Sequence, residues 1–306
     1  MPEGAKPMRV LVSGSSGLIG SALVRRLQDR GHVVGRLVRR QTKSEHEVRW
    51  DPDRLEIDRE GLEGWSAVVH LAGENIASGR WTSARKKRIR ESRVLGTGLL
   101  SDTLAGLPEP PATLVCASAI GFYGNRGDEV LTEESPQGKG FLASVCLAWE
   151  AAAQPARQVG IRVVQPRIGV VLSPDGGALK KMLLPFRLGL GGRLGSGNQW
   201  ISWISLPDMI GVLMRALEDD DMSGAYNAVA PNPVTNAEFT RTLGKVLGRP
   251  TLFPVPEFAL RLMLGAEMAQ ELLLASARVE PRRLQAHHHE FLHKDLETAL
   301  RAVIPV

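Results

Sequence analysis

The sequence has little cysteine and no long apolar run, and both shortages exclude classes of protein. Its 306 residues include only two cysteines, Cys116 and Cys146, which excludes a disulfide scaffold and favours a reducing, cytoplasmic compartment. The stretch nearest to purely apolar, residues 112–121, is too short to span a bilayer. Residues 1–7 contain no apolar segment, so we expect no secretory signal and no membrane partner.

The net charge is small as well. The chain has 38 Lys and Arg residues against 33 Asp and Glu residues, a net charge of +5, which is mild for this length. The densest basic run, residues 85–90, has only Trp81 as a nearby aromatic residue, whereas proteins that bind single-stranded nucleic acid interleave basic and aromatic side chains. We therefore expect a solvated helix face at this run and no nucleic-acid partner.

What the sequence does contain is an alternation of two kinds of segment. Helical patterns separate short apolar runs that are typical of buried strands. The strand-like runs are residues 9–13, 33–38, 67–72, 113–117, 161–164 and 168–172, and the helical patterns are residues 21–30, 83–104 and 141–159. This alternation predicts an α/β fold with a Rossmann-type, doubly wound parallel sheet.

The pattern changes after about residue 173. Five glycines fall between residues 189 and 197. Helix-like segments follow at residues 207–217, 236–247, 258–264, 268–275 and 296–303. We therefore predict a nucleotide-binding Rossmann domain over residues 8–172 and a smaller, mostly helical region on the substrate side over residues 173–306, with the chain partly interleaved between the two.

A glycine-rich loop follows the first strand. Gly14, Gly17 and Gly20 have the spacing Gly-x-x-Gly-x-x-Gly, one residue different from the dinucleotide fingerprint of the older dehydrogenases. Gly14 permits a tight turn, Gly17 lets the backbone approach a pyrophosphate, and Gly20 lets the helix pack on the sheet. The helix N-terminus then directs free N–H groups at phosphate. A connection without a ligand is the alternative, and the entropy cost of three glycines argues against it.

The end of the second strand indicates which dinucleotide binds. NAD sites commonly place a carboxylate near this position, where it holds the ribose 2′-OH. Here the strand ends Val38-Arg39-Arg40 with no acidic residue close, and two guanidinium groups suit a 2′-phosphate. An ordinary solvated strand end is the alternative, and we predict NADP as the cofactor.

These motifs and others along nearly the whole chain resemble the short-chain dehydrogenase/reductase superfamily. They include Leu11–Gly20, His70–Asn75, Ser118–Gly124, Trp149–Ala153 and Arg167–Leu172. The similarity is to the extended, nucleotide-sugar epimerase-like branch, and within it to an atypical group of epimerase-family proteins with a C-terminal domain of unknown function. The resemblance implies an NADP-type Rossmann fold with the substrate cleft between it and the C-terminal part.

The resemblance also implies which residues bind the cofactor. They are Gly14, Ser16, Gly17, Leu18, Ile19 and Gly20 in the loop, and Arg39, Arg40, Leu71, Ala72, Gly73, Arg93 and Val171 elsewhere. Arg93 belongs to a recurrent Ser-Arg pair, which would place its guanidinium near the phosphates, and a similar role for Arg88 stays open.

The usual catalytic residues of the superfamily are missing. Its chemistry normally needs a Ser, a Tyr and a Lys, with the last two spaced Tyr-x-x-x-Lys. The chain has two tyrosines, Tyr123 and Tyr226, and neither has Lys four residues on; the family's positions hold Leu142 and Cys146. Ser118 and Tyr123 are the remaining catalytic candidates, although packing or a loop hydrogen bond is the slightly favoured role of Tyr123.

Together these features predict an NADP(H)-binding, oxidoreductase-like protein of the epimerase family. It would act on a small or sugar-like carbonyl or hydroxyl compound whose identity stays open. The alternative is a non-catalytic NADP(H)-binding redox sensor or regulatory protein. A second copy of the chain, in a homodimer, is left open as a partner.

Two further histidine features have plain interpretations. His289-Glu-Phe-Leu-His293 matches the zinc motif His-Glu-x-x-His, but no histidine follows it, and the resembling proteins have a strand-like alternation at this segment. We expect a fortuitous surface cluster over His287–His293 and no metal. His70, at the end of a buried strand, is expected to be a core residue, as are both cysteines.

Overall fold

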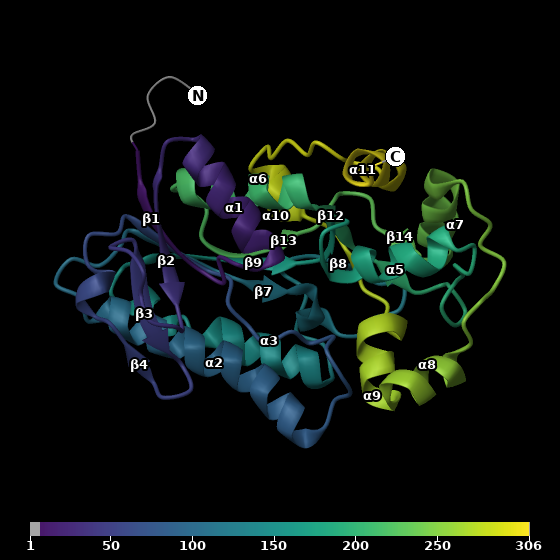
Figure 1. The fold of residues 1–306 in the computed structure, drawn as a ribbon, viewed down its shortest axis with the longest axis horizontal. Coiled ribbons are helices and arrows are strands. Elements are labelled where there is room, and N and C mark those ends of the chain that lie inside the picture. Colours follow the sequence, from purple (N-terminus) through teal and green to yellow (C-terminus); the bar gives the residue numbers. More distant parts are fainter. Residues whose placement is uncertain (1–6, 306) are drawn as a thin grey trace.

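A large sheet organises the computed structural model, which describes residues 7–305 (Figure 1). Within these residues nine strands join it in the order β13-β9-β6-β5-β1-β2-β3-β4, with β7 beside β9. The strands are β1 Arg9–Ser13, β2 Val33–Val38, β3 Glu47–Asp51, β4 Glu56–Ile57, β5 Ala67–His70, β6 Thr113–Cys116, β7 Ser118–Ala119, β9 Arg162–Ile168 and β13 Gly224–Ala228. Every pair is parallel except β3 with β4. Successive strands run outward from β1 in one direction and from β5 in the other, so the predicted doubly wound sheet is confirmed.

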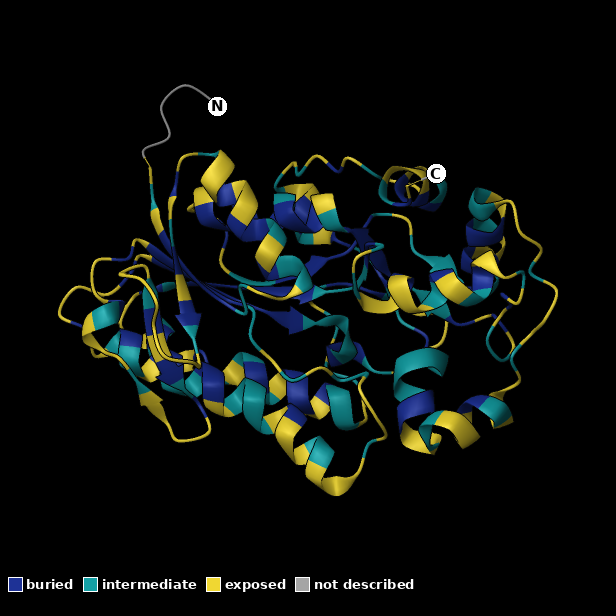
Figure 2. Cartoon of the chain, viewed as in Figure 1, coloured by how far each residue is buried: buried dark blue, intermediate teal, exposed yellow. Residues whose placement is uncertain are grey.

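Helices cover both faces of this sheet. One face carries α1 (Leu18–Asp29) and α6 (Leu206–Glu218), and the other carries α2 (Ser83–Ala105), α3 (Phe141–Ala151) and α4 (Gln154–Gln158). Alternate side chains of β1 point to opposite faces: Val10 and Val12 pack with α1 and α6, whereas Leu11 packs with α2. Figure 2 shows the buried positions of the helices turned toward the sheet.

Two predicted helices are divided. The single helix expected over residues 141–159 is wrong, because α3 ends at Ala151 and α4 begins at Gln154 with Pro155 in its first turn. Proline has no N–H to continue the hydrogen bonding of the preceding helix, so it favours a new start. The helix expected over residues 268–275 is a short α-helix, α9 (Ala266–Ala269), that continues as the π-helix η3 (Gln270–Leu274).

The remaining elements lie outside the large sheet and the five helices that cover it. They are the 3-10 turns η1 (Glu60–Leu62) and η2 (Ile120–Tyr123); strands β8 (Val130–Leu131), β10 (Val170–Leu172), β11 (Trp200–Ile201), β12 (Trp203–Ser205), β14 (Val234–Thr235) and β15 (Arg278–Val279); and helices α5 (Gly177–Arg187), α7 (Asn236–Leu247), α8 (Glu257–Leu264), α10 (Arg282–Ala286) and α11 (Leu296–Val303). Helices α5, α7 and α11 enclose a separate apolar cluster around Trp203 and Phe239.

The chain passes more than once between the predicted Rossmann domain and the region predicted after residue 172. Residues 206–228 lie beyond the boundary expected at residue 172, and they return to the large sheet as α6 and β13. In the other direction, β8 of the first region pairs with β15 near the C-terminus. No helix within residues 7–305 combines the length and the apolar character needed to cross a membrane.

Candidate functional site

The glycine loop follows β1 at the carboxyl edge of the parallel sheet, where β1 and β5 lie side by side and the strand order reverses. Gly14 has φ +64°, and an added Cβ would come 2.8 Å from the carbonyl carbon of Leu71. An added Cβ on Gly20 would come 2.2 Å from the Gly14 carbonyl oxygen. These two glycines are therefore required by the packing of the chain itself.

Gly17 differs, because its outward side is open. An added Cβ would meet, among the described residues, only the Gly14 carbonyl oxygen, at 3.2 Å. Gly17 is the N-cap of α1 and provides no side chain to the first-turn N–H groups, which are left to bind an anion. Ser16 and Gly17 are exposed at the loop tip, whereas Leu18 and Ile19 are half-buried.

The turn after β5 is fixed against this loop by Ser13 and His70. The Ser13 hydroxyl accepts hydrogen bonds from the N–H groups of Leu71 (3.1 Å) and Ala72 (3.2 Å), and it lies 2.7 Å from His70 Nδ1. Burial lowers the pKa of His70 to about 4. Because the Ser13 oxygen already accepts two N–H groups, its hydroxyl donates to Nδ1 of the neutral ring, and His70 Nε2 has no hydrogen-bond partner among the described residues. His70 is fully buried, as predicted, and the Leu71–Gly73 turn is held beside Gly14.

Arg93 lies next to the same turn. Its Nη1 donates to the carbonyl oxygens of Glu74 (3.0 Å) and Ile89 (3.1 Å), and its guanidinium carbon lies 5.1 Å from the centre of the Trp149 ring. An added Cβ on Gly73 would lie 3.3 Å from that carbon. Burial lowers the pKa of Arg93. The Arg93 side chain packs against the Leu71–Gly73 turn.

Val171 approaches the glycine loop from the other side. It lies in β10, directly before α5, and its carbonyl oxygen would be 3.6 Å from a Cβ on Gly177. The preceding Gly176 contacts Leu18, since an added Cβ would lie 3.2 Å from Leu18 Cδ1. The structure thus brings Leu18 and Val171, far apart in sequence, to the same place.

A carboxylate that sequence reasoning missed, Glu47 of β3, lies beside the end of β2. Arg40 Nη1 donates to Glu47 Oε2 at 2.8 Å, and its Nη2 donates to the other carboxylate oxygen. The hydrogen bond from Arg40 is the largest cause that lowers the pKa of Glu47 to about 2, followed by the bond from the Lys43 N–H. The expectation of no acidic residue close to this strand end is therefore wrong, because β3 brings Glu47 alongside; Arg39 is exposed beside the pair.

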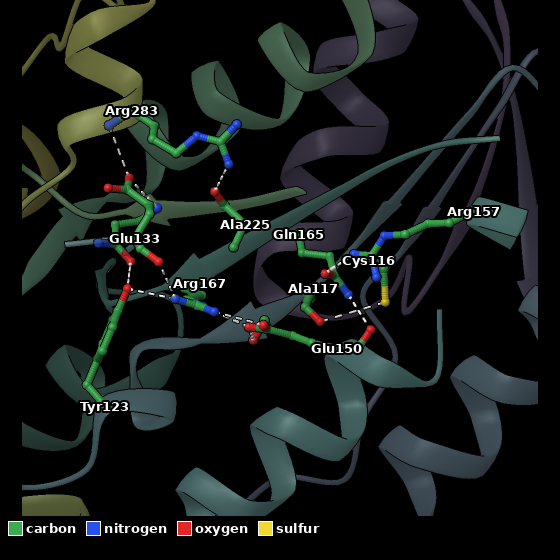
Figure 3. A network of polar contacts seen from close by, with 12 residues as sticks. Cys116, Ala117, Tyr123, Glu133, Glu150, Arg157, Gln165, Arg167, Ala225 and Arg283 are labelled. Atoms are coloured by element: carbon green, nitrogen blue, oxygen red, sulfur yellow. Dashed lines mark hydrogen bonds and ion pairs between the residues drawn. The ribbon is translucent and has the colours of Figure 1, made fainter. Parts of the chain in front are cut away.

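Ser118 is engaged by a buried ion pair. Its hydroxyl donates to Glu150 Oε1 at 2.6 Å. Arg167, from β9, donates through Nε to Oε1 (2.8 Å) and through Nη2 to Oε2 (2.9 Å) of the same carboxylate, as Figure 3 shows for Arg167 and Glu150. Because the ionised carboxylate only accepts, the Ser118 proton is held by Glu150.

Tyr123 belongs to the same network (Figure 3). Its ring is fully buried, its O–H donates to Asn227 Oδ1 at 2.6 Å, and its oxygen accepts from Arg167 Nη1 at 2.9 Å. Burial raises the pKa of Tyr123 despite the nearby guanidinium. Its hydroxyl is occupied on both its donor and acceptor sides by protein groups, which is the packing role that the sequence slightly favoured.

The two positions of the missing catalytic pair lie together beside Gly121. An added Cβ on Gly121 would lie 3.3 Å from Leu142 Cβ and 3.7 Å from Cys146 Sγ. Burial raises the pKa of Cys146 to about 12, so the thiol stays protonated at neutral pH. The two positions that the resemblance assigns to the catalytic pair thus hold a leucine and a buried, neutral thiol.

The histidine segment does not form a zinc helix. Residues 289–293 have no helical structure, and they extend along α6. His289 lies beside Gly211, whereas His293 Nδ1 lies 2.9 Å from the Ser205 hydroxyl at the start of α6. Because the segment is not helical, His289 and His293 do not share a helix face, which the zinc motif requires.

Comparisons with known proteins agree with this architecture. Residues 10–229 match the model of the NAD dependent epimerase/dehydratase family, and residues 255–303 match a domain of unknown function. An epimerase family protein of Mycobacterium tuberculosis is 46% identical over 291 residues, covering 95% of this chain and 96% of that protein. The human epimerase family protein SDR39U1 is 38% identical over 300 residues, covering 97% of this chain and 100% of that protein.

Solved structures extend the comparison. The crystal structure of human epimerase family protein SDR39U1 with NADPH superposes with a TM-score of 0.90 at 37% identity, covering 97% of this chain and 99% of that one. A nucleoside-diphosphate sugar epimerase from Corynebacterium glutamicum gives a TM-score of 0.81 at 40% identity, covering 97% of this chain and 58% of that one. This chain belongs to the NAD dependent epimerase/dehydratase family, in the group that carries the C-terminal domain of unknown function.

Proposed function

We propose that the protein binds NADP(H) at the glycine loop and is an oxidoreductase-like member of its family, acting on a small or sugar-like carbonyl or hydroxyl compound. The observation that carries the proposal is the open Gly17 at the uncapped N-terminus of α1, at the point where the strand order reverses. Ligands of doubly wound folds bind at this point. Phosphates fit there because the first-turn N–H groups and the helix dipole both favour an anion.

The choice of NADP over NAD is supported by the end of β2. Glu47 is already bound by Arg40 and by the N–H of Lys43, so it is poorly placed to accept a ribose 2′-OH. Arg40 is held in one orientation, and Arg39 is exposed next to it. Two guanidinium groups at this position suit a 2′-phosphate, and the human relative was crystallised with NADPH.

Bound NADP(H) would supply a hydride or accept one, and the residues of the chain would hold it. The Leu71–Gly73 turn, fixed by Ser13, would border the nucleotide, and Arg93 would stabilise that turn from beneath. Ser118 would face the reacting end with its hydroxyl proton already donated to Glu150. In that state Ser118 can only accept a hydrogen bond, so it would orient a hydroxyl group rather than donate a proton to a carbonyl.

A non-catalytic redox sensor is the second candidate, and one observation favours it. Leu142 and Cys146 stand where the superfamily has its tyrosine and lysine, and Tyr123 is buried with its hydroxyl bound on both sides. Such a protein would bind the cofactor and transmit its presence without turning it over. The cytoplasmic location stays a prediction, since an Arabidopsis relative is named as chloroplastic.

Cofactor turnover separates the two candidates. The purified protein is mixed with NADPH or NADP⁺ and a panel of sugar nucleotides, simple carbonyls and alcohols, and the nicotinamide absorbance is followed. We expect intact NADPH binding with slow or undetectable turnover of common sugar nucleotides and carbonyls. Brisk turnover of a standard sugar nucleotide would refute the claim that the usual proton-transfer chemistry is lost.

A further inference from the structure

Arg93 of α2 carries a positive charge that no carboxylate of the described residues neutralises. Its side chain is half-buried. Glu74, whose backbone oxygen it binds, has its carboxylate 2.8 Å from Arg85 Nη1 instead. Glu150, on the neighbouring helix α3, accepts two hydrogen bonds from Arg167. Charges that are taken out of water are normally paired, because the loss of hydration is costly. The unpaired guanidinium of Arg93 therefore indicates a ligand.

Part of this guanidinium is free to bind one. Its hydrogen bonds to the described part of the chain all come from Nη1, which donates to the carbonyl oxygens of Glu74 and Ile89. Nε and Nη2 have no acceptor there, and neither nitrogen is fully buried. These two nitrogens form a planar fork that binds a pair of neighbouring oxygen atoms. Arg167 uses the same two nitrogens to bind both oxygens of Glu150.

Arg93 lies level with Cys146, the position that the resemblance assigns to the missing lysine. Helices α2 and α3 pack side by side (Figure 1), because Trp149 Nε1 donates to Thr97 Oγ1 at 2.9 Å. One turn further along, α2 bonds to an N–H of α4, so the helices run in the same direction. Arg93 precedes Thr97 by about one turn, and Cys146 precedes Trp149 by about one turn. Burial raises the pKa of Cys146, and the charge of Arg93 opposes that rise.

The same place lies on the nicotinamide side of the proposed cofactor site. Neighbouring strands follow the order β2-β1-β5-β6. In the proposed binding mode the 2′-phosphate lies after β2 and the pyrophosphate after β1, so the nicotinamide half continues past β5 toward Ser118. Arg93 packs against Gly73 in the turn after β5, where an added Cβ would lie 3.4 Å from Arg93 Nη2. The ribose of this half has two neighbouring hydroxyl groups, which suit the free fork.

We propose that Arg93 supplies from α2 the cation that α3 lacks, and that its Nε and Nη2 donate to the two hydroxyl oxygens of the nicotinamide-side ribose. The inference rests on the proposed NADP(H) site, and it gives Arg93 a different role from the phosphate contact that the resemblance implies. It also explains the cysteine at position 146. A side chain much shorter than lysine leaves room there for a guanidinium from the neighbouring helix.

Calorimetric titration with three ligands tests the assignment. NADPH and 2′-phospho-ADP-ribose contain the second ribose, whereas 2′-phospho-ADP has both bridging phosphates without it. We expect Arg93→Met to weaken the binding of the first two about tenfold or more, and to leave that of 2′-phospho-ADP within about twofold, because only the bonds to the ribose are lost. Arg90→Met is the matched control. Arg90 is exposed on the same helix, and its loss should change none of the three affinities.

A double variant tests the position of the charge. Adding Cys146→Lys to Arg93→Met returns a cation to α3, and NADPH affinity should recover to within about threefold of the unaltered protein. Arg93→Lys keeps the charge without the fork, so it should lose less affinity than Arg93→Met. Circular dichroism confirms the fold of each variant. Where Arg93→Met does not fold, Arg93→Lys provides the same comparison of the three ligands.

The outcomes separate this inference from the proposed function. If Arg93→Met binds NADPH like the unaltered protein, loses 2′-phospho-ADP equally, or is not rescued by a folded Cys146→Lys double variant, the inference is overturned while the NADP(H) site stands. If the unaltered protein does not bind NADPH, the proposed function is refuted and this inference falls with it.

Discussion

Substituting the glycines of the loop separates ligand binding from folding. Gly17 has φ −75° and ψ 172°, extended angles that any residue adopts. Among residues 7–305, an added Cβ would press on only the Gly14 carbonyl oxygen, at 3.2 Å, so Gly17→Val should destabilise the fold by about 1 kcal/mol or less. Its side chain would occupy the space in front of the α1 N-terminus that a pyrophosphate needs.

Gly20→Ala should instead lower the stability of the fold. Its Cβ would lie 2.2 Å from the Gly14 carbonyl oxygen, so the loop and α1 must move apart. Overpacking of this kind costs roughly 1–3 kcal/mol or more. The loss should be visible in stability before any ligand is added.

Thermal unfolding and calorimetry measure the two effects. We expect Gly17→Val to keep its Tm within about 4 °C of the wild type and to lose at least about a hundredfold in NADPH affinity, because two charge-assisted bonds to phosphate are blocked. Gly20→Ala should show the larger fall in Tm. If Gly17→Val stays folded and binds NADPH normally, the loop is not the phosphate site, and if Gly20→Ala keeps the wild-type Tm, the close packing of α1 is misjudged.

Three further predictions concern single side chains. Arg40→Ala should weaken NADPH binding about tenfold or more with little effect on NADH, and equal losses by calorimetry would remove Arg40 from a 2′-phosphate site. Tyr123→Phe should lower the free energy of unfolding by about 1–3 kcal/mol and leave NADPH affinity unchanged; where a substrate is found, a catalytic role requires kcat to fall about a hundredfold, and an active variant excludes that role. The pKa of His70 lies at about 4 in the folded state against about 6.5 when unfolded, so its neutral form contributes stability that is complete above pH 6.5 and is lost as the pH falls toward 4. Urea unfolding at pH 7.5 and at pH 5 measures this. Between these two pH values the free energy of unfolding should fall by about 2 kcal/mol more in the wild type than in His70→Gln, and an equal fall in both proteins would contradict this.

Local patterns predicted two helices of the C-terminal region with their bounds. The helices expected over residues 236–247 and 296–303 have those bounds in the structure. Thr235 and Glu238 form a capping box at the first, and Asp295 caps the second, and such signals lie within four residues of the boundary they set. The spacing of the glycine loop is equally local: the structure confirms the tight packing at Gly14 and Gly20, and the phosphate-binding role of Gly17 stays a prediction.

The polar network could not be predicted in this way, because its members are distant in sequence. Among the described residues, Arg167 in β9 bonds to both Glu150 and Tyr123 and so joins them. One signal was available: Arg167 stands between the two strand-like runs at residues 161–164 and 168–172, and a buried arginine requires an acidic partner. Glu47 was missed for a related reason, since only the pairing of β2 with β3 brings it to Arg40.

Calorimetric titration of the purified protein with NADPH and with NADH tests the central claim most directly. In the proposed binding mode the 2′-phosphate lies beside Arg39 and Arg40 and the pyrophosphate lies at Gly17. It predicts one site per chain and an affinity for NADPH at least about ten times that for NADH. Equal affinities, a preference for NADH, or no binding of either nucleotide would contradict it.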